Sequence, residues 1–527
     1  MKTDPMTMIV NDTPLRWQDI VDVARNHNQL ALSAERWQGI EEAREAVETM
    51  ADSGKAYYGI NTGLGALCHV VLNPTQLEQL SWHTLMSHAC GVGQPLSDEQ
   101  VRAIMCCAVV NYSQGCSGIS PWVVKALVYF LNHEVTPIVP SQGSVGYLSH
   151  MAHIGLALIG EGEVSYQGKV QPCAEAFQQI QYCPGRLGAK DGLSLVNGTP
   201  AMTGLACLAL ADSGLLAQWA DVVGAMSFEA LFGQLDAFDP AILARKNDPE
   251  AIEVGKTLRS LLAGSALLAS KQGHHLQDAL SLRAIPQVHG TCWRQWHHAV
   301  EQIENELNAS TDNPLVIKEE DSYRVVSQAN PHGEAVAQAC DFLAIAISEW
   351  SAISERRSYR LVTPQANELP AFLSPESGVK SGMMIAQYSA ASLAADNKRL
   401  AQPCVVDNYL TSGLQEDHLS FGDSAALKLT AALDNAFYIL AIEYLLAAQA
   451  FDLIESEGFG FGTTRAWQQL REQVAFYDET RSLHVDIKRT YQIMREPGSI
   501  KTILEGASQS TGMSWRGHRD VLESRTQ

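Results

Sequence analysis

The residues of this sequence that could do chemistry stand in short polar motifs spread between residues 57 and 420. Tyr58 lies in a glycine-rich loop, and a phenol, whose ordinary pKa is about 10, can act as a base once that pKa is lowered. Arg283 precedes a proline-bearing turn, where an arginine is normally only a surface charge. His150 and His153 have no acidic or cysteine ligand beside them, so we expect no metal site. Taken singly, such residues are more often structural, and only their combination indicates a site.

A glycine turn that opens a helix stands at residues 143–153. Gly143 and Gly146 predict a tight turn, because only glycine takes positive φ without penalty. After Tyr147 the apolar residues follow helical spacing. Such a turn can hold an anion at the start of a helix, although more often it is only a turn.

The same stretch resembles the active-site signature of the histidine and aromatic amino acid ammonia-lyases. That signature reads Gly-Ser-Val-Gly, then Ala-Ser-Gly, then Asp-Leu-Ala-Pro-Leu-Ala-His. Here Gly146 is followed directly by Tyr147, so Ala-Ser-Gly is absent, whereas Leu148, Ala152 and His153 match. In the family those three residues cyclise autocatalytically, with loss of water, into a methylidene-imidazolone ring that acts as an electrophile. We predict that the tripeptide stands between Gly146 and Tyr147 as one modified residue left out of the written sequence. The alternative is a true deletion, which would give a non-catalytic homologue.

Further motifs match the family in the same order along the chain, and the resemblance implies a role for each. Tyr58 falls on the catalytic base, Asn197 on an amide that contacts the electrophile or the substrate amine, and Arg283 on the group that grips the substrate carboxylate. Gln277 maps to a polar wall of the site and Asn313 to its mouth or carboxylate end. Two residues depart from the family pattern: Leu280 replaces a catalytic tyrosine, and Pro331 replaces an aromatic ring of the pocket.

The substrate is indicated by two short segments. Ser87-His88 and Glu416, which follows Gln415, are the choices typical of histidine lyases. The imidazole of His88 could hydrogen-bond a polar ring, and Glu416 could pair with a substrate imidazole or move the proton of the leaving ammonia. We therefore expect histidine to be converted to urocanate. Because Leu280 and Pro331 depart from the pattern, a tyrosine or phenylalanine ammonia-lyase and a 2,3-aminomutase stay open as alternatives.

The fold is expected to be mainly helical. Apolar residues follow the helical period over 205–232, 252–270 and 295–308, whereas strand-like alternation is confined to 163–170 and 322–326. The resemblance implies the all-α fold of the ammonia-lyase/fumarase-like superfamily. Its parts here would be a loop-rich N-terminal domain at 1–200 that carries the electrophile, a long-helix bundle at 201–460 and a C-terminal helical tail at 461–527. It also implies a homotetramer whose sites are shared between subunits.

The composition limits the partners. The chain has 527 residues, 46% of them hydrophobic, and a formal net charge of −21, which argues against nucleic acid and anionic membranes. The first residues lack the pattern of a signal peptide, and no run reaches the roughly 18 apolar residues of a membrane-spanning helix. Eleven scattered cysteines are typical of a reduced, cytoplasmic protein. We expect a small-molecule amino acid as the partner.

Overall fold

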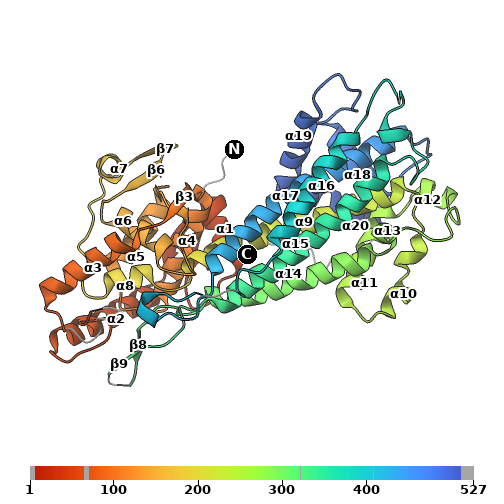
Figure 1. Ribbon diagram of the computed structural model, residues 1–527. Helices are drawn as coiled ribbons and strands as arrows, with labels where there is room; N and C mark the ends of the chain where they lie inside the picture. The colour runs from red at the N-terminus through yellow and green to blue at the C-terminus, as the bar shows by residue number, and fades with distance from the viewer. Residues whose placement is uncertain (1–5, 64–70, 321, 377, 407–408, 512–527) are drawn as a thin grey trace. The chain divides into compact units, whose positions relative to one another are not determined.

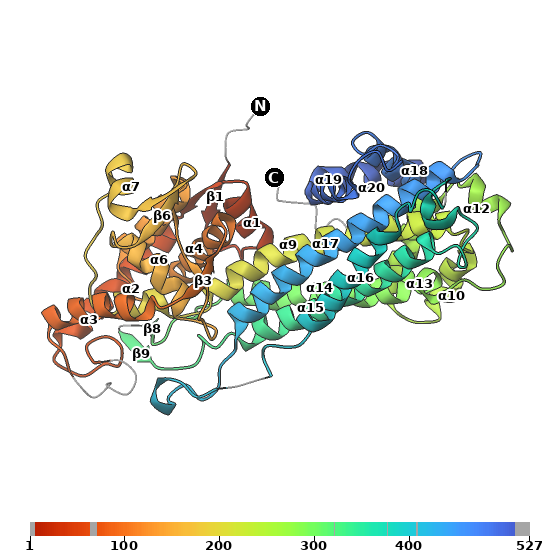
Figure 2. The same ribbon diagram turned by 45° about the horizontal axis from the view of Figure 1, so that its top comes forward.

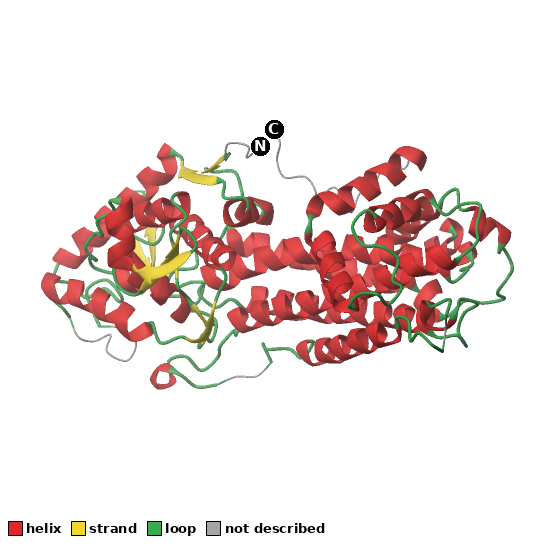
Figure 3. Cartoon of the chain, turned by 90° about the horizontal axis from the view of Figure 1, so that it is seen from above, coloured by secondary structure: helices red, strands yellow, loops and turns green. Residues whose placement is uncertain are grey.

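The computed structural model describes residues 6–63, 71–320, 322–376, 378–406 and 409–511, and most of them are helical (Figures 1 and 3). The chain forms two compact units, each built from three separate segments. Unit 1 comprises Met1–Leu210, Ala299–Asp341 and Pro403–Leu427, and unit 2 comprises Ala211–His298, Phe342–Gln402 and Lys428–Gln527. These units cut the chain differently from the three consecutive segments expected from the sequence, because several long helices carry residues of both. The three-segment division stays a prediction.

Unit 1 contains short helices and all the strands among the described residues (Figure 3). Its helices are α1 (Trp17–Arg25), α2 (Ala34–Asp52), α3 (Pro74–His88), α4 (Asp98–Ser113), α5 (Pro121–Asn132), α6 (Ser149–Leu158), α7 (Cys173–Ile180), α8 (Asp191–Val196) and the 3-10 turn η4 (Ser412–Leu414). Its strands are β1 (Thr7–Val10), β2 (Gln29–Leu32), β3 (Val92–Pro95), β4 (Thr136–Pro137), β5 (Pro140–Gln142), β6 (Glu163–Tyr166), β7 (Lys169–Pro172), β8 (Leu315–Lys318) and β9 (Tyr323–Val326). The described strands form four small sheets. β1 and β2 pair in parallel. The sheets β3–β5, β4–β6–β7 and β8–β9 are antiparallel.

Helix α3 packs against α6 and α8, and this trio positions much of the site described below. α3 begins at a reciprocal cap, in which Asn73 accepts from the Gln76 backbone and the Gln76 side chain accepts from the Asn73 backbone. Its last residue is His88. Tyr147 stands just before α6, and Asn197 stands just after α8. The packing of the three helices therefore determines where those side chains lie.

The described part of unit 2 consists mainly of helices and turns. Its elements are η2 (Leu235–Phe238), α10 (Pro240–Ala244), α11 (Pro249–Leu262), α12 (Ala266–Ser270), α13 (Leu280–Arg283), η3 (Ala371–Leu373), α16 (Met384–Leu400), α18 (Phe461–Arg471), α19 (Leu483–Arg495) and α20 (Pro497–Thr511). Four longer helices contribute residues to both units: α9 (Pro200–Ala230), α14 (Ile285–Leu307), α15 (Glu334–Val362) and α17 (Gly422–Leu453). Their unit 2 portions run side by side with α16 (Figures 1 and 2).

A buried polar cluster ties these long helices together within unit 2. Arg357 of α15 donates from Nε and Nη2 to the two carboxylate oxygens of Glu443 of α17, at 2.5 and 2.9 Å. Ser227 of α9 donates to the same carboxylate at 2.6 Å. A two-point pair of this kind fixes the register of neighbouring helices, because breaking it would leave a buried charge without a partner.

Three helical stretches are long and apolar enough, by length and composition, to cross a membrane: Asp191–Ala230, Glu334–Val362 and Gly422–Leu453. Their most apolar windows are 94%, 67% and 83% buried inside the protein. A helix that is apolar on all sides is expected in the core of a large protein as well as in a membrane. Most of the residues in these windows are covered by other parts of the chain.

The expected elements are largely confirmed. The strand-like stretches 163–170 and 322–326 contain β6, β7 and β9, and the helical stretches 205–232 and 295–308 fall on α9 and α14. Two expectations were wrong: β1 to β5 and β8 lie outside the two stretches where strands were expected, and the continuous helix at 252–270 is split into α11 and α12. Gly264 takes a φ of 79° between them, a left-handed conformation that ends a helix.

Candidate active site

A cavity of about 800 Å³ lies in unit 1, where loops from distant parts of the sequence meet. Eight of the residues singled out from the sequence line it: Tyr58, His88, Tyr147, Asn197, Asn313, Pro331, Gln415 and Glu416. The other lining residues are Leu148, Leu193, Ser327, Gln328, Ala329, His332, Ser412, Asp417 and His418. Ser87 and Gly146 stand next to lining residues without being among them.

Tyr58 lies in a loop that is stabilised by hydrogen bonds between its own residues. The side chain of Asn61 accepts from the Tyr57 backbone at 2.8 Å and donates to the Lys55 carbonyl at 2.8 Å. Asn61 is almost fully buried, so these bonds are sheltered from water. Leu64 and Gly65, which complete the motif in the sequence, lie outside the described residues.

His88 is oriented by the last turn of α3. Its Nδ1 lies 2.7 Å from the Thr84 carbonyl and 3.1 Å from the Ser87 hydroxyl. Because a carbonyl can only accept, we assign the proton of the neutral ring to Nδ1, which makes Nε2 the acceptor. Ser87 thus contributes by orienting His88 and is itself exposed.

Asn197 is held by a buried ion pair. Its Nδ2 donates to the Asn313 carbonyl at 2.7 Å and to Asp312 Oδ1 at 3.3 Å. Asp312 in turn accepts from Lys190 Nζ at 2.6 Å, and both side chains are fully buried. Both amide protons of Asn197 are therefore used inside the protein, and its amide oxygen is the group left to face a ligand.

Glu416 lies in the segment that follows η4. Its Oε2 accepts from the Thr411 hydroxyl at 2.9 Å, and its backbone oxygen accepts from the Thr411 N–H at 2.9 Å. Tyr147 lines the same cavity as Glu416. Burial first, and then the nearby Glu416 carboxylate, raise the pKa of Tyr147 well above its ordinary value. Tyr147 is therefore a neutral phenol in this cavity.

The turn at residues 143–149 is held in place by hydrogen bonds to Asp423 of α17. Ser144 donates to the Asp423 carboxylate, and Asp423 Oδ2 lies 3.1 Å from His150 Nδ1. The Gly146 N–H donates to Ser144 Oγ at 3.2 Å. Gly143 and Gly146 both have positive φ, at 110° and 131°, as the turn motif predicts.

The methylidene-imidazolone ring does not fit the residues at this turn. Gly146 is joined directly to Tyr147, and no serine-glycine pair stands between residues 143 and 149. The backbone is held on both sides of the junction, where Phe421 N–H donates to Val145 O and Leu148 N–H donates to Val196 O, each at 3.0 Å. The chain, as its sequence stands, thus lacks the residues that form the ring.

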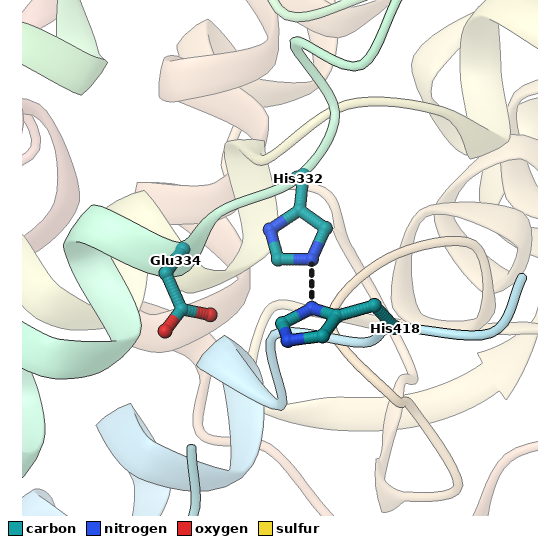
Figure 4. Close-up of side chains that lie close together, drawn as sticks. All are labelled: His332, Glu334 and His418. Carbon is teal, nitrogen blue, oxygen red and sulfur yellow. Dashed lines mark hydrogen bonds between the residues drawn. The ribbon is translucent and has the colours of Figure 1, made fainter. Parts of the chain in front are cut away.

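Two histidines missed as site residues form a pair at the wall of the cavity (Figure 4). His332 Nε2 lies 3.0 Å from His418 Nδ1. Together with Glu334 they offer ligand atoms within 4.8 Å of one another. Each ring already uses one nitrogen in the bond between them, so we assign them to the wall of the cavity. Both stood in motifs visible in the sequence, Asn330–Glu334 and Gln415–Ser420.

Gln277, Leu280 and Arg283 belong to unit 2 and are not among the described residues that line the cavity. Arg283 Nη2 donates to the amide oxygen of Gln277 at 2.8 Å when that amide is oriented with its oxygen toward the guanidinium. The side chain of Leu280 is 66% exposed. Their roles at a site stay predictions.

Residues 15–472 match the family model described as aromatic amino acid lyase. The chain belongs to the aromatic amino acid lyase family. It is 40% identical over 511 residues to the histidine ammonia-lyase of Treponema denticola, covering 96% of this chain and 100% of that one. The crystal structure of the histidine ammonia-lyase of Trypanosoma cruzi is similar, with 31% identity, a TM-score of 0.89 and 99% of both chains covered. The ergothioneine-degrading ergothionase of Treponema denticola, in complex with desmethyl-ergothioneine sulfonic acid, is also similar, with 30% identity, a TM-score of 0.87 and 94% of this chain and 99% of that chain covered.

These similarities confirm the ammonia-lyase fold expected from the sequence, and they make this protein a carbon–nitrogen lyase of the ammonia-lyase type.

Proposed function

We propose that this lyase eliminates the α-amino group of an amino acid that carries an imidazole ring, with histidine, which would give urocanate, as the first substrate to test. The observation that carries the proposal is the cavity of unit 1, which brings Tyr58, His88, Asn197 and Glu416 together from four distant motifs. Relatives named histidine ammonia-lyase, at about 40% identity over nearly the whole chain, support it.

Each group of the cavity has a task suited to its chemistry. Tyr58 removes a proton from the β-carbon, and Asn197 places its amide oxygen against the α-amino group. The imidazole of the substrate lies between His88, whose Nε2 accepts a hydrogen bond, and Glu416, which stabilises a protonated ring. Holding base, β-carbon and amine together supplies much of the rate by proximity. No step passes through the methylidene-imidazolone ring, because the residues present do not fit it.

The remaining predicted residues complete the site. Arg283 and Gln277 bind the carboxylate and a polar edge of the substrate, and Ser87, Asn313 and Gln415 adjust the walls. Leu280 and Pro331 stand where the family pattern has aromatic rings and leave a wider pocket.

Since Arg283 and Gln277 belong to unit 2, we further propose a cytoplasmic homotetramer in which each site takes residues from more than one subunit. None of the ten cysteines in the described part of the chain forms a disulfide, which suits a reducing compartment.

The test is a substrate panel on the purified protein. Imidazole-bearing amino acids are expected to give urocanate, whereas tyrosine and phenylalanine give little coumarate or cinnamate, and no β-amino acid accumulates. Coumarate, cinnamate or a β-amino acid as main product would favour the tyrosine or phenylalanine lyase or the 2,3-aminomutase instead. A protein that forms none of these products from any aromatic amino acid, N-methylated or free, would be a non-catalytic homologue.

One of the similar proteins widens the panel. The ergothionase degrades ergothioneine. Ergothioneine is by definition the betaine of 2-thiohistidine, so its α-nitrogen carries three methyl groups. Betaines of histidine and of 2-thiohistidine therefore belong among the substrates tested.

A further inference from the structure

The starting observation is the direct bond between Gly146 and Tyr147. In the family signature this is the place of the electrophile, whose task is to turn a free amine into a better leaving group. Here Gly146 is packed so closely that a Cβ at this position would lie 2.3 Å from Ser420 Oγ. The next residue, Tyr147, lines the cavity together with Glu416. A neutral aromatic ring beside a carboxylate thus follows the turn, and neither group can activate an amine covalently.

We propose that this enzyme eliminates an amine that already bears a permanent positive charge, so that its substrate is an α-trimethylammonium carboxylate with an aromatic ring, and that Tyr147 and Glu416 bind this cation. The inference rests on the proposed function and specifies its leaving group. A trimethylammonium group keeps its charge until the carbon–nitrogen bond breaks and so needs no covalent activation. A free α-ammonium group has N–H protons far more acidic than the β C–H, so a base beside it removes those protons first and the amine no longer leaves.

The walls of the cavity suit such a cation. The rings of Tyr58 and Tyr147 offer aromatic faces, which attract quaternary ammonium groups. Glu416 and Asp417 add negative charge, and the amide oxygen of Asn197 adds the negative end of a dipole. Among the described residues that line the cavity there is no lysine or arginine. The electrostatic field at this wall of the cavity therefore favours a positively charged group. The aromatic rings favour one that has no N–H to donate.

The reaction balances without any further reagent. The phenolate of Tyr58 takes a proton from the β-carbon, and the electron pair of that C–H bond forms the double bond between the α- and β-carbons. The α-carbon–nitrogen bond breaks, and its electron pair leaves with nitrogen as neutral trimethylamine. A zwitterionic betaine and a phenolate thus become an acrylate anion, a neutral amine and a neutral phenol.

The decisive experiment compares Nα-trimethyl-L-histidine with L-histidine on the purified full-length protein, following urocanate by absorbance and trimethylamine by NMR. We expect kcat/KM to favour the trimethylated compound by about 100-fold or more, as when a site discriminates by a specific contact. Sodium borohydride, which reduces the family's electrophile, should leave activity unchanged. The intact mass should equal that of the encoded residues.

The possible failures are distinguishable. Efficient turnover of free histidine, loss of activity with borohydride, or extra mass between Gly146 and Tyr147 would overturn this inference and leave the proposed function standing. No acrylate from either compound, or from any other aromatic betaine, would overturn the proposed function itself.

Variants of Tyr147 test its part separately. Tyr147→Phe keeps the ring and should change the KM for the trimethylated substrate little, whereas Tyr147→Ala should raise it about tenfold with a smaller effect on kcat. Tyr166→Ala, on β6, is the matched control. Equal effects of Phe and Ala at position 147 would rule out ring–cation binding. A measurement that needs no variant is inhibition of the unchanged enzyme, where tetramethylammonium should compete with substrate and ammonium should not; equal inhibition would contradict the proposal.

Discussion

At the scale of single residues, the site depends on buried polar groups that satisfy one another. Asp312 accepts from Lys190, from Ser194 at 2.8 Å and from Ser117 at 2.6 Å, and it also holds Asn197. None of these bonds reaches a ligand. They fix the direction of the Asn197 amide, because a buried donor that loses its acceptor costs more than the bond itself contributes.

Asp312→Asn is therefore expected to affect stability and catalysis together. The ammonium of Lys190 would lose its charged partner in a fully buried place, which should lower the free energy of unfolding by about 3 kcal/mol or more. Asn197 would also be free to turn, so kcat should fall more than KM rises. Urea denaturation and steady-state kinetics measure the two effects. Ser117→Ala, which removes one neutral bond to the same carboxylate, is the control and should cost about 1 kcal/mol. Equal costs for the two variants would show that Lys190 is not dependent on Asp312.

His150 gives a pH dependence of stability. Burial alone would lower its pKa, but the Asp423 carboxylate, the hydrogen bond to it and the Ser141 carbonyl together raise it. A raised folded pKa means that the stabilisation is fully present below the unfolded value of about 6.5 and is lost as the pH rises through the folded value. The stability lost in His150→Gln should therefore shrink as the pH rises through this window. Denaturation between pH 6 and pH 9, with the exposed His133→Gln as control, measures it, and a constant difference would contradict a charged His150.

The sequence allowed eight of the seventeen residues that line the cavity to be predicted as site residues, because each motif is local. Tyr58, Asn197 and Glu416 could be assigned from the few residues beside them. The ion pair of Lys190 with Asp312 could not, since its members stand 122 positions apart and neither has a local pattern that names the other. The place of Tyr147 in the wall of the cavity was also not predicted, because Tyr147 was expected only to flank a modified residue.

At the scale of elements, the turn before α6 decides where Tyr147 stands. Its position depends on the positive φ of Gly146 and on the contact of that residue with Ser420. The need for glycine was readable from the turn motif, but the neighbour that enforces it stands far away in the sequence. Similarly, the stretch 252–270 has a continuous helical pattern, and only the backbone at Gly264 shows that it forms two helices.

Gly146→Ala is expected to disturb this turn. Alanine at a φ of 131° is strained, and its Cβ would meet Ser420 Oγ, so the free energy of unfolding should fall by about 1–3 kcal/mol. Because Tyr147 would shift with the turn, the KM for substrate should rise as well. Thermal denaturation and kinetics measure both. Adding Ser420→Ala should recover the part due to the steric contact and leave the part due to φ; a double variant as unstable as the single one would exclude the contact as a cause.

At the scale of the whole molecule, the chain keeps its cavity in unit 1 and the predicted carboxylate-binding residues Arg283 and Gln277 in unit 2. The consecutive domains expected from the sequence did not reveal this division, because a periodic pattern marks a helix without showing which unit each half of it joins. Tyr58 and Arg283 stand on different units, and this makes the proposed sharing of sites between subunits testable by mixing two inactive proteins.

Tyr58→Phe and Arg283→Ala are each expected to abolish turnover, the first by removing the base and the second by removing the carboxylate ligand. If each site takes Tyr58 from one subunit and Arg283 from another, co-expression of the two variants in equal amounts restores about a quarter of the sites, because each site needs two unaltered residues drawn independently. Active-site titration with the substrate that proves best, on tetramers purified by size, measures this fraction. Co-expression of Tyr58→Phe with Asn197→Ala, both in the cavity of unit 1, is the matched control and should restore nothing. Recovery in neither mixture would mean that each chain builds its site alone, since only residues carried by different subunits can complement one another.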